Sequence, residues 1–322
     1  MNTLPLSRAL FGRRVIALAM TVWLAAGCDR QPPTPLGDST AVGDSSRAAG
    51  RELLPVTGSG WDDGLGPFLV LPTVDDGLMA GSFLRPEATE LTVGDTVGVG
   101  AAAADGRIEL FSRGGPVGWA RLSVEPAASV DAGCTAWPVA RLTRDAGGAV
   151  VPWTVAFAAG RVESIPLDSI EGFTPRDSTR LATELTRLAS ALPDDTSRTF
   201  RGLPFVVLRA WRSRGLDTAF VVATLARRVN QEDAPKEERL VLVVDAIGND
   251  PKRWTVAWHE RASGSEDELV VAEPLLAFRT MGARDPRLLF GRDDGVALSA
   301  AVLSRESSGW RVLWESAMVG CN

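Results

Sequence analysis

The chain has 322 residues, of which 45% are hydrophobic and 23% charged, a balance typical of a globular protein with one large domain or two smaller ones. Its formal net charge of −6 argues against a general nucleic-acid binder, because phosphate recognition needs a concentrated basic face. Its single histidine excludes metal sites built on two histidines. We therefore expect no nucleic-acid partner, no metal and no cofactor.

The N-terminus has the three zones of a secretory signal peptide. Arginines near the start make it positive, and no acidic residue occurs before Asp29. A continuous apolar run follows over residues 15–26 and ends in small residues. The run is too short to span a bilayer comfortably, so it predicts an export signal with a cleavage site rather than a membrane-spanning helix.

The last four residues of this segment, Ala25-Ala26-Gly27-Cys28, resemble the lipobox of bacterial lipoproteins. The resemblance implies that Cys28 becomes the new N-terminus and carries acyl chains such as palmitate. These chains would anchor the protein to a membrane of the cell envelope, facing the periplasm or the exterior. Several chains are needed, because each buried methylene contributes only about 0.8 kcal/mol.

Asp29, directly after the cysteine, resembles the signal that retains lipoproteins at the inner membrane of enteric bacteria. Other lineages do not follow that rule, so the choice between inner and outer membrane stays open. An ordinary cleaved signal and an uncleaved anchor helix are the alternatives to lipidation.

Changes in composition divide the chain into five segments. Residues 1–27 are the expected signal peptide, and residues 28–60 are rich in Pro, Ser, Gly and Asp, which predicts a disordered tether. A β-rich first half is expected over 61–172, and a helix with its connection over 173–202. A β-rich second half over 203–322 is expected to dock on the first.

Short apolar runs separated by turn sequences predict β-strands in both halves. The clearest runs are 68–71, 108–111, 119–124, 205–208, 220–223 and 240–244. The last three are unbroken, which predicts strands buried on both faces. The expected fold class is therefore mainly β, with an antiparallel, propeller-like or sandwich-like body, and an α+β fold is the alternative.

One segment has helical rather than strand periodicity. Thr174 is a candidate N-cap, Pro175 suits the first helical position, and Asp177 places an acid in the first turn. Leucines recur at helical spacing up to Leu192, and Pro193 ends the run. The pattern predicts one amphipathic helix near residues 175–192, whose apolar stripe packs against the body rather than against a partner.

A five-residue pattern with an aromatic residue at each end occurs at 153–157, 254–258 and 310–314. Alternate residues of a strand point to one face, so each copy is expected to place two aromatics and a valine on one side. We expect that side to face the core, where aromatic contacts stabilise a sheet. An exposed aromatic strip that binds sugar or peptide is the alternative.

Residues 275–316 resemble a degenerate blade of β-propellers of the FG-GAP or VCBS type. The runs 275–278 and 287–291 would be its first two strands. In that family an Asp-rich calcium loop joins these strands, whereas Asp285 is the sole carboxylate of the connection in this chain. The resemblance thus implies an order of strands but no calcium site.

Of the three cysteines, Cys28 is assigned to lipid. In an exported protein the remaining two, Cys134 and Cys321, are expected to form a disulfide, with two buried free thiols as the alternative. A disulfide would bring their Cα atoms within about 4.4–6.8 Å, so the C-terminal end would dock against the first half.

The sequence carries no catalytic signature: it has no nucleophile elbow and no phosphate-binding glycine loop. Nothing marks a nucleophile for His259 to activate, and Lys236 and Lys252 lie in polar stretches that do not desolvate an amine. The Asp-Asp-Gly sequences, the first at 62–64, are interpreted as turns, because calcium loops alternate their carboxylates.

Two function classes remain. The favoured one is a lipid-anchored envelope protein with a non-catalytic domain that binds or scaffolds another envelope protein or polymer. The alternative is a carboxylate-based hydrolase of envelope or extracellular polymers. Two carboxylates about 5–9 Å apart in a pocket would favour the hydrolase.

Overall fold

A computed structural model describes most of the chain after residue 59. The described residues are 60–73, 79–86, 106–125, 137–144, 151–193, 198–229, 235–248, 250–265, 269–293 and 297–320. All of these residues belong to one compact unit, which begins at Ala48. The expected signal peptide, Cys28 and almost all of the expected tether lie outside the described residues.

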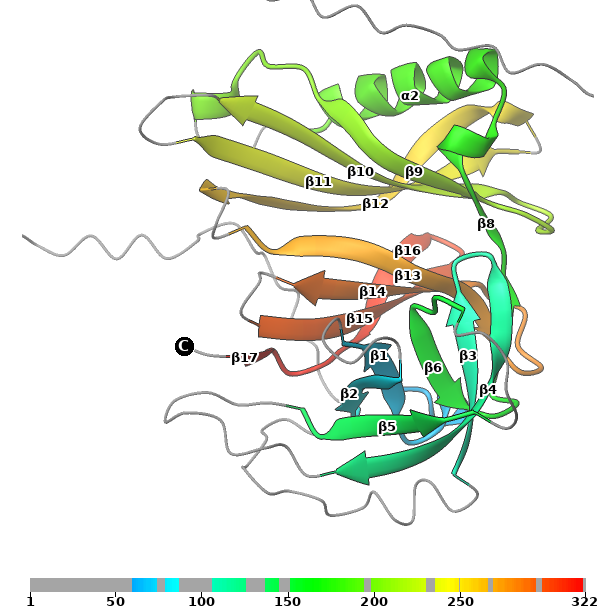
Figure 1. The fold of residues 1–322 in the computed structure, drawn as a ribbon. Helices are drawn as coiled ribbons and strands as arrows, with labels where there is room; N and C mark the ends of the chain where they lie inside the picture. Colours follow the sequence, from blue (N-terminus) through cyan, green and yellow to red (C-terminus); the bar gives the residue numbers. More distant parts are fainter. Residues whose placement is uncertain are drawn as a thin grey trace, which may run out of the picture. The chain divides into compact units, whose positions relative to one another are not determined.

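The first strands close into an antiparallel barrel (Figure 1). In chain order they follow the short helix η1 (Asp63–Leu65) and are β1 (Leu69–Pro72), β2 (Ala80–Leu84), β3 (Arg107–Ser112), β4 (Gly115–Glu125), β5 (Val139–Thr143) and β6 (Val155–Ala158). Around the barrel the order is β1-β2-β5-β4-β3-β6, and β6 pairs back onto β1. Val70 points into the barrel core, whereas Leu69 and Leu71 face outward into another apolar cluster. The β1 run is apolar throughout because both of its faces are buried.

The remaining strands form two antiparallel sheets. They are β7 (Val162–Ile165), β8 (Leu167–Ser169), β9 (Val206–Ser213), β10 (Phe220–Val229), β11 (Lys236–Ile247), β12 (Asp250–Ser265), β13 (Val271–Thr280), β14 (Arg287–Asp293), β15 (Ala297–Glu306), β16 (Gly309–Glu315) and β17 (Val319–Gly320). The helix-side sheet has the order β12-β11-β10-β9-β8. The barrel-side sheet has the order β16-β15-β14-β13-β7, with β17 paired to β15.

The connection between β8 and β9, within the helix-side sheet, carries the helix. After β8 come η2 (Ile170–Gly172), α2 (Pro175–Ser190) and η3 (Arg198–Phe200). Thr174 caps α2 by accepting a hydrogen bond from the backbone N–H of Asp177, as the sequence predicted. The leucine stripe of α2 is buried against the helix-side sheet, which confirms its packing role.

The elements stack in four layers, which Figure 1 shows from α2 at the top to the barrel at the bottom. Leu185 belongs to the core between α2 and the helix-side sheet. Phe220 and Phe290 belong to the core between the two sheets. Phe157 of the barrel and Phe278 of the barrel-side sheet meet in a third core, with ring centroids 5.6 Å apart. Each sheet therefore packs against another layer on both of its faces.

The predicted fold class is confirmed: the described chain is mainly β, its sheets are antiparallel, and α2 is its one α-helix. The two stacked sheets are sandwich-like. β10 and β11 are buried on both faces, as their unbroken apolar runs predicted. The same prediction is wrong for β9, where Val206 is 61% exposed. β8 pairs only with the end of β9 from Trp211 to Ser213, so the beginning of β9 lies at the edge of the sheet.

The aromatic pattern is divided between two cores in each copy, contrary to the one-sided arrangement expected. In β12, Trp254 faces α2 whereas Trp258 faces the barrel-side sheet. In β16, Trp310 faces the helix-side sheet whereas Trp314 faces the barrel. Register shifts between Val256 and Trp258 and between Val312 and Trp314 explain this, because one inserted residue reverses the alternation.

The copy at residues 153–157, which runs into β6, is also divided between two cores. Trp153 lies in the barrel core, and Val155 and Phe157 lie in the core outside the barrel. Because Trp153, Trp254, Trp310 and Trp314 are buried, these residues do not form an exposed binding strip.

Candidate functional site

A cavity of about 530 Å³ lies between the barrel and the barrel-side sheet. The described residues that line it are Leu71, Pro72, Arg113, Trp153, Thr154, Val271, Glu273, Leu275, Gly291 and Leu298. The barrel contributes the first five of these residues, and β13, β14 and β15 contribute the others. The volume falls within the range of small-molecule sites, which is about 300–1,000 Å³. We name this space the junction cavity.

Apolar side chains form most of the cavity wall because the barrel and the sheet both turn hydrophobic strand faces toward it. Leu71 and Trp153 are almost fully buried, and Leu275 and Leu298 pack against the core between barrel and sheet. Thr154 contributes a hydroxyl, but that hydroxyl donates to the backbone carbonyl of Leu275 at 2.7 Å. The polar groups that remain for a ligand are therefore the charged ones.

Gly291 helps to keep the cavity open. Its Cα pairs with Glu273 of β13 and Ala300 of β15 in regular extended backbone, so the chain conformation does not demand glycine. A Cβ at this position would lie 3.1 Å from Cδ1 of Leu275, which is one of the lining side chains. A larger residue would therefore extend into space that the cavity now occupies.

Arg113 and Glu273 form an ion pair at the cavity. Arg113 lies in the turn between β3 and β4, and its Nη2 donates to Oε1 of Glu273 at 2.5 Å. Its Nε donates to the carbonyl of Pro274 at 2.6 Å, and its guanidinium lies 5.1 Å from the ring centroid of Trp211. These contacts hold the guanidinium in one orientation against β13.

A second arginine reaches the same carboxylate from the helix-side sheet. Nη1 of Arg209 donates to Oε1 of Glu273 at 3.0 Å. Two guanidinium groups thus share one carboxylate, and this trio carries a net positive charge. Burial lowers the pKa of Arg113, the carboxylate of Glu273 raises it in part, and the charge of Arg209 lowers it again. The environment therefore leaves the positive charge of Arg113 incompletely compensated.

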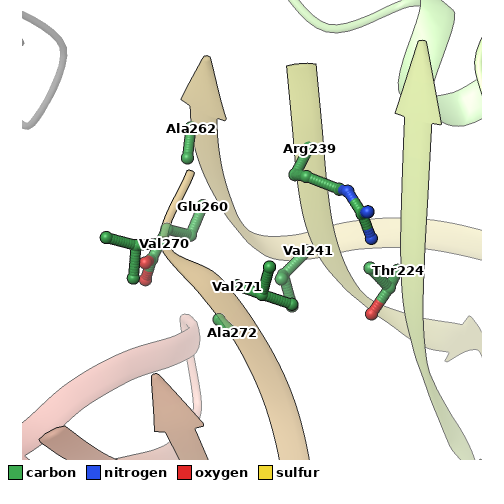
Figure 2. Close-up of a pocket in the computed structure, with 8 residues that line it drawn as sticks. All are labelled: Thr224, Arg239, Val241, Glu260, Ala262, Val270, Val271 and Ala272. Carbon is green, nitrogen blue, oxygen red and sulfur yellow. The ribbon is translucent and has the colours of Figure 1, made fainter. Parts of the chain in front are cut away.

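A much smaller space lies between the two sheets, as Figure 2 shows. Its lining residues are Thr224, Arg239, Val241, Glu260, Ala262, Val270, Val271 and Ala272. Its volume of about 10 Å³ is no more than one water molecule needs. It is a packing space between the sheets rather than a ligand site.

Buried ion pairs form another group of charged residues, and one of them connects the two sheets. Arg292 of β14 bridges Glu260 of β12 at 2.5 Å and Glu315 of β16 at 2.6 Å. In the helix-side sheet, Glu238 pairs with Arg227 and is completely buried. Each of these charges has an opposite charge beside it, so the pairs have a structural role.

The candidate residues from the sequence are not at the junction cavity. His259 lies exposed on β12, the last strand in the order of its sheet. Within the described ranges, no three His, Cys, Asp or Glu side chains gather as a metal site. Asp62 caps η1 and also bonds Arg287 at 2.5 Å, so the first Asp-Asp-Gly sequence serves local structure. Lys236 begins β11 and is exposed.

Cys134 and Cys321 lie outside the described residues, and their disulfide stays a prediction. The chain near each of them does converge on β15. The indole of Trp137 donates to the carbonyl of Leu298 at 3.4 Å, and Leu298 pairs with Val319 of β17. The expected pairing is compatible with this path of the chain.

No sequence pattern marks Arg113, Glu273, Arg209 or Gly291. Arg113 and Glu273 are 160 positions apart, and no motif surrounds either of them. The fold alone brings them together.

In the described part of the chain, no helix is both long enough and apolar enough to cross a membrane. Comparison of the chain with protein-family models, with curated proteins and with solved structures finds no match. The junction cavity is therefore the feature of the molecule that indicates a function.

Proposed function

We propose that the chain is a lipid-anchored cell-envelope protein whose β-rich domain binds a small, largely apolar ligand without transforming it. The observation that carries this proposal is the junction cavity of about 530 Å³. Binding sites for small molecules combine apolar walls with a small number of convergent polar groups. The junction cavity has this composition, with apolar walls and one cluster of charged side chains.

The charged cluster favours binding over hydrolysis. Glu273 is the one carboxylate among the described lining residues, and two arginines already contact it. A two-carboxylate hydrolase needs a second carboxyl group about 5–9 Å from the first. The described lining gives the hydrolase alternative no support.

The envelope location in this proposal is supported by the sequence alone. The lipobox-like residues that end at Cys28 follow an apolar run of the length of an export signal. In that setting the ligand would be a component of the envelope or a solute within it.

Native mass spectrometry of the mature, full-length protein purified from membranes tests the binding function. We expect a non-covalently bound small molecule in the parent protein and its loss in Gly291→Leu, where the new side chain enters the cavity. Gly264→Leu is the matched control, because a Cβ at Gly264 meets nothing within 4 Å. Equal occupancy in Gly291→Leu, or no bound molecule in any of the three proteins, would contradict the proposal.

A further inference from the structure

The charges beside the junction cavity do not balance. Arg113 of the barrel and Arg209 of the helix-side sheet both donate to Oε1 of Glu273. Arg113 and Glu273 line the cavity, and their side chains are 25% and 39% exposed, so solvent reaches them only in part. Arg209 does not line the cavity, and its side chain is 62% exposed. An anion that enters here would meet an excess of positive charge at a partly desolvated position.

The two arginines also retain donors for such an anion. A guanidinium has five N–H groups. Among the described residues, Arg113 uses its Nε and Nη2 atoms, and Arg209 uses Nη1. The contacts with Pro274 and Glu273 fix Arg113, so it is oriented before any ligand arrives.

The rest of the cavity suits a hydrocarbon body. Leu71, Leu275 and Leu298 present apolar side chains, and Trp153 adds an aromatic surface. One water molecule of the liquid occupies about 30 Å³, so a space of about 530 Å³ holds about 18 non-hydrogen atoms of similar size. A single unbranched chain with a small polar head is of that size.

From this combination we infer that the junction cavity binds a monoanionic amphiphile of the fatty-acid class. Its carboxylate accepts hydrogen bonds from Arg113 and Arg209, and its chain occupies the apolar cavity. This inference rests on the proposed function, and it adds the charge and the chemical class of the ligand.

Isothermal titration of the mature full-length protein, with each probe kept below its solubility or micelle limit, tests the inference. The probes are laurate, lauryl alcohol and laurylamine, which share one chain and differ in the charge of the head. We expect laurate to bind about tenfold or more tightly than the alcohol, which is the effect of one charge-assisted hydrogen bond. The cationic amine should bind most weakly.

Variants identify the groups responsible. Arg209→Gln and Arg113→Gln should each reduce the preference for laurate, and Glu273→Gln should increase it, because that carboxylate competes for the arginines. Arg187→Gln is the matched control, since its side chain on α2 is 61% exposed and that of Arg209 is 62% exposed. Gly291→Leu should abolish the binding of every probe.

The outcomes separate this inference from the proposed function. Equal binding of laurate and the alcohol, both lost in Gly291→Leu, would overturn the anionic head while supporting a small-ligand site. Laurate binding that survives in Gly291→Leu would place the ligand elsewhere and overturn the inference. If no probe binds, the fatty-acid class is wrong, and native mass spectrometry still decides the proposed function.

Discussion

The buried pair of Arg227 and Glu238 allows a quantitative test of how much a buried ion pair contributes to the stability of this fold. The two residues lie opposite each other on β10 and β11, with side chains 7% and 0% exposed. The guanidinium of Arg227 lies 4.7 Å from the ring centroid of Phe205, and Arg261 lies 3.6 Å from Oε1 of Glu238. Glu238 therefore faces two guanidinium groups in a region closed to water.

Glu238→Gln removes the carboxylate and leaves both positive charges in place. Removal of one partner of a buried ion pair lowers the free energy of unfolding by about 3–5 kcal/mol, because the remaining charge is buried away from water without a partner. The double variant Arg227→Met/Glu238→Gln removes the charges of Arg227 and Glu238 and leaves that of Arg261. We expect it to lose about 2 kcal/mol less than the sum of the two single losses.

Urea unfolding of the mature protein, followed by far-UV circular dichroism, measures these free energies of unfolding. Glu306→Gln is the control, because Glu306 and its partner Arg311 are 39% and 59% exposed and their pair should contribute less than about 1 kcal/mol. A loss below about 1 kcal/mol for Glu238→Gln, or strictly additive losses in the double variant, would refute the reasoning.

Four further predictions can be checked directly. Mass spectrometry of the mature N-terminus should find acyl chains on Cys28, and an unmodified terminus would exclude the lipid anchor. Non-reducing peptide mapping of envelope-purified protein should link Cys134 to Cys321, whereas two free thiols would disprove the bond. A chelator should leave the melting temperature unchanged, and a fall of many degrees would reveal a structural metal. Burial raises the pKa of Asp62, but hydrogen bonds from a backbone N–H and from Arg287 outweigh it and hold the pKa below the ordinary value of an aspartate. The stability advantage over Asp62→Asn should therefore be present above the ordinary pKa of an aspartate and disappear in acid titration as the pH falls through the lower pKa of the folded protein.

Local patterns predicted most of the secondary structure because each of them is complete within a short segment. The cap at Thr174 and the leucine stripe act within four turns of one helix, and both occur as expected. The apolar runs of β10 and β11 predicted burial on both faces because a single strand displays both faces in its own sequence.

The sequence could not predict features that depend on pairing between distant segments. Closure of the barrel depends on Leu69 pairing with Phe157, and no residue marks that contact. The register shifts in β12 and β16 bring in Ala257 and Leu313, which are ordinary strand residues, so the reversal of the aromatic faces left no signal. The junction cavity could not be predicted from the sequence for the same reason, since Arg113 comes from the barrel and Gly291 from the barrel-side sheet.

The place of β7 in the barrel-side sheet limits the order in which the strands can pair during folding. Ile165 pairs with Ala277, so β7 must wait for β13, which follows only after the whole helix-side sheet. Each hairpin from β9 to β16 joins neighbours in the chain and forms at a small loop-closure cost, whereas long-range closures of this kind are slow. The barrel-side sheet is therefore finished late, and until then the outer face of the barrel around Phe157 lacks the partner that buries it. Before this stage is complete, the exposed face makes the chain vulnerable to aggregation.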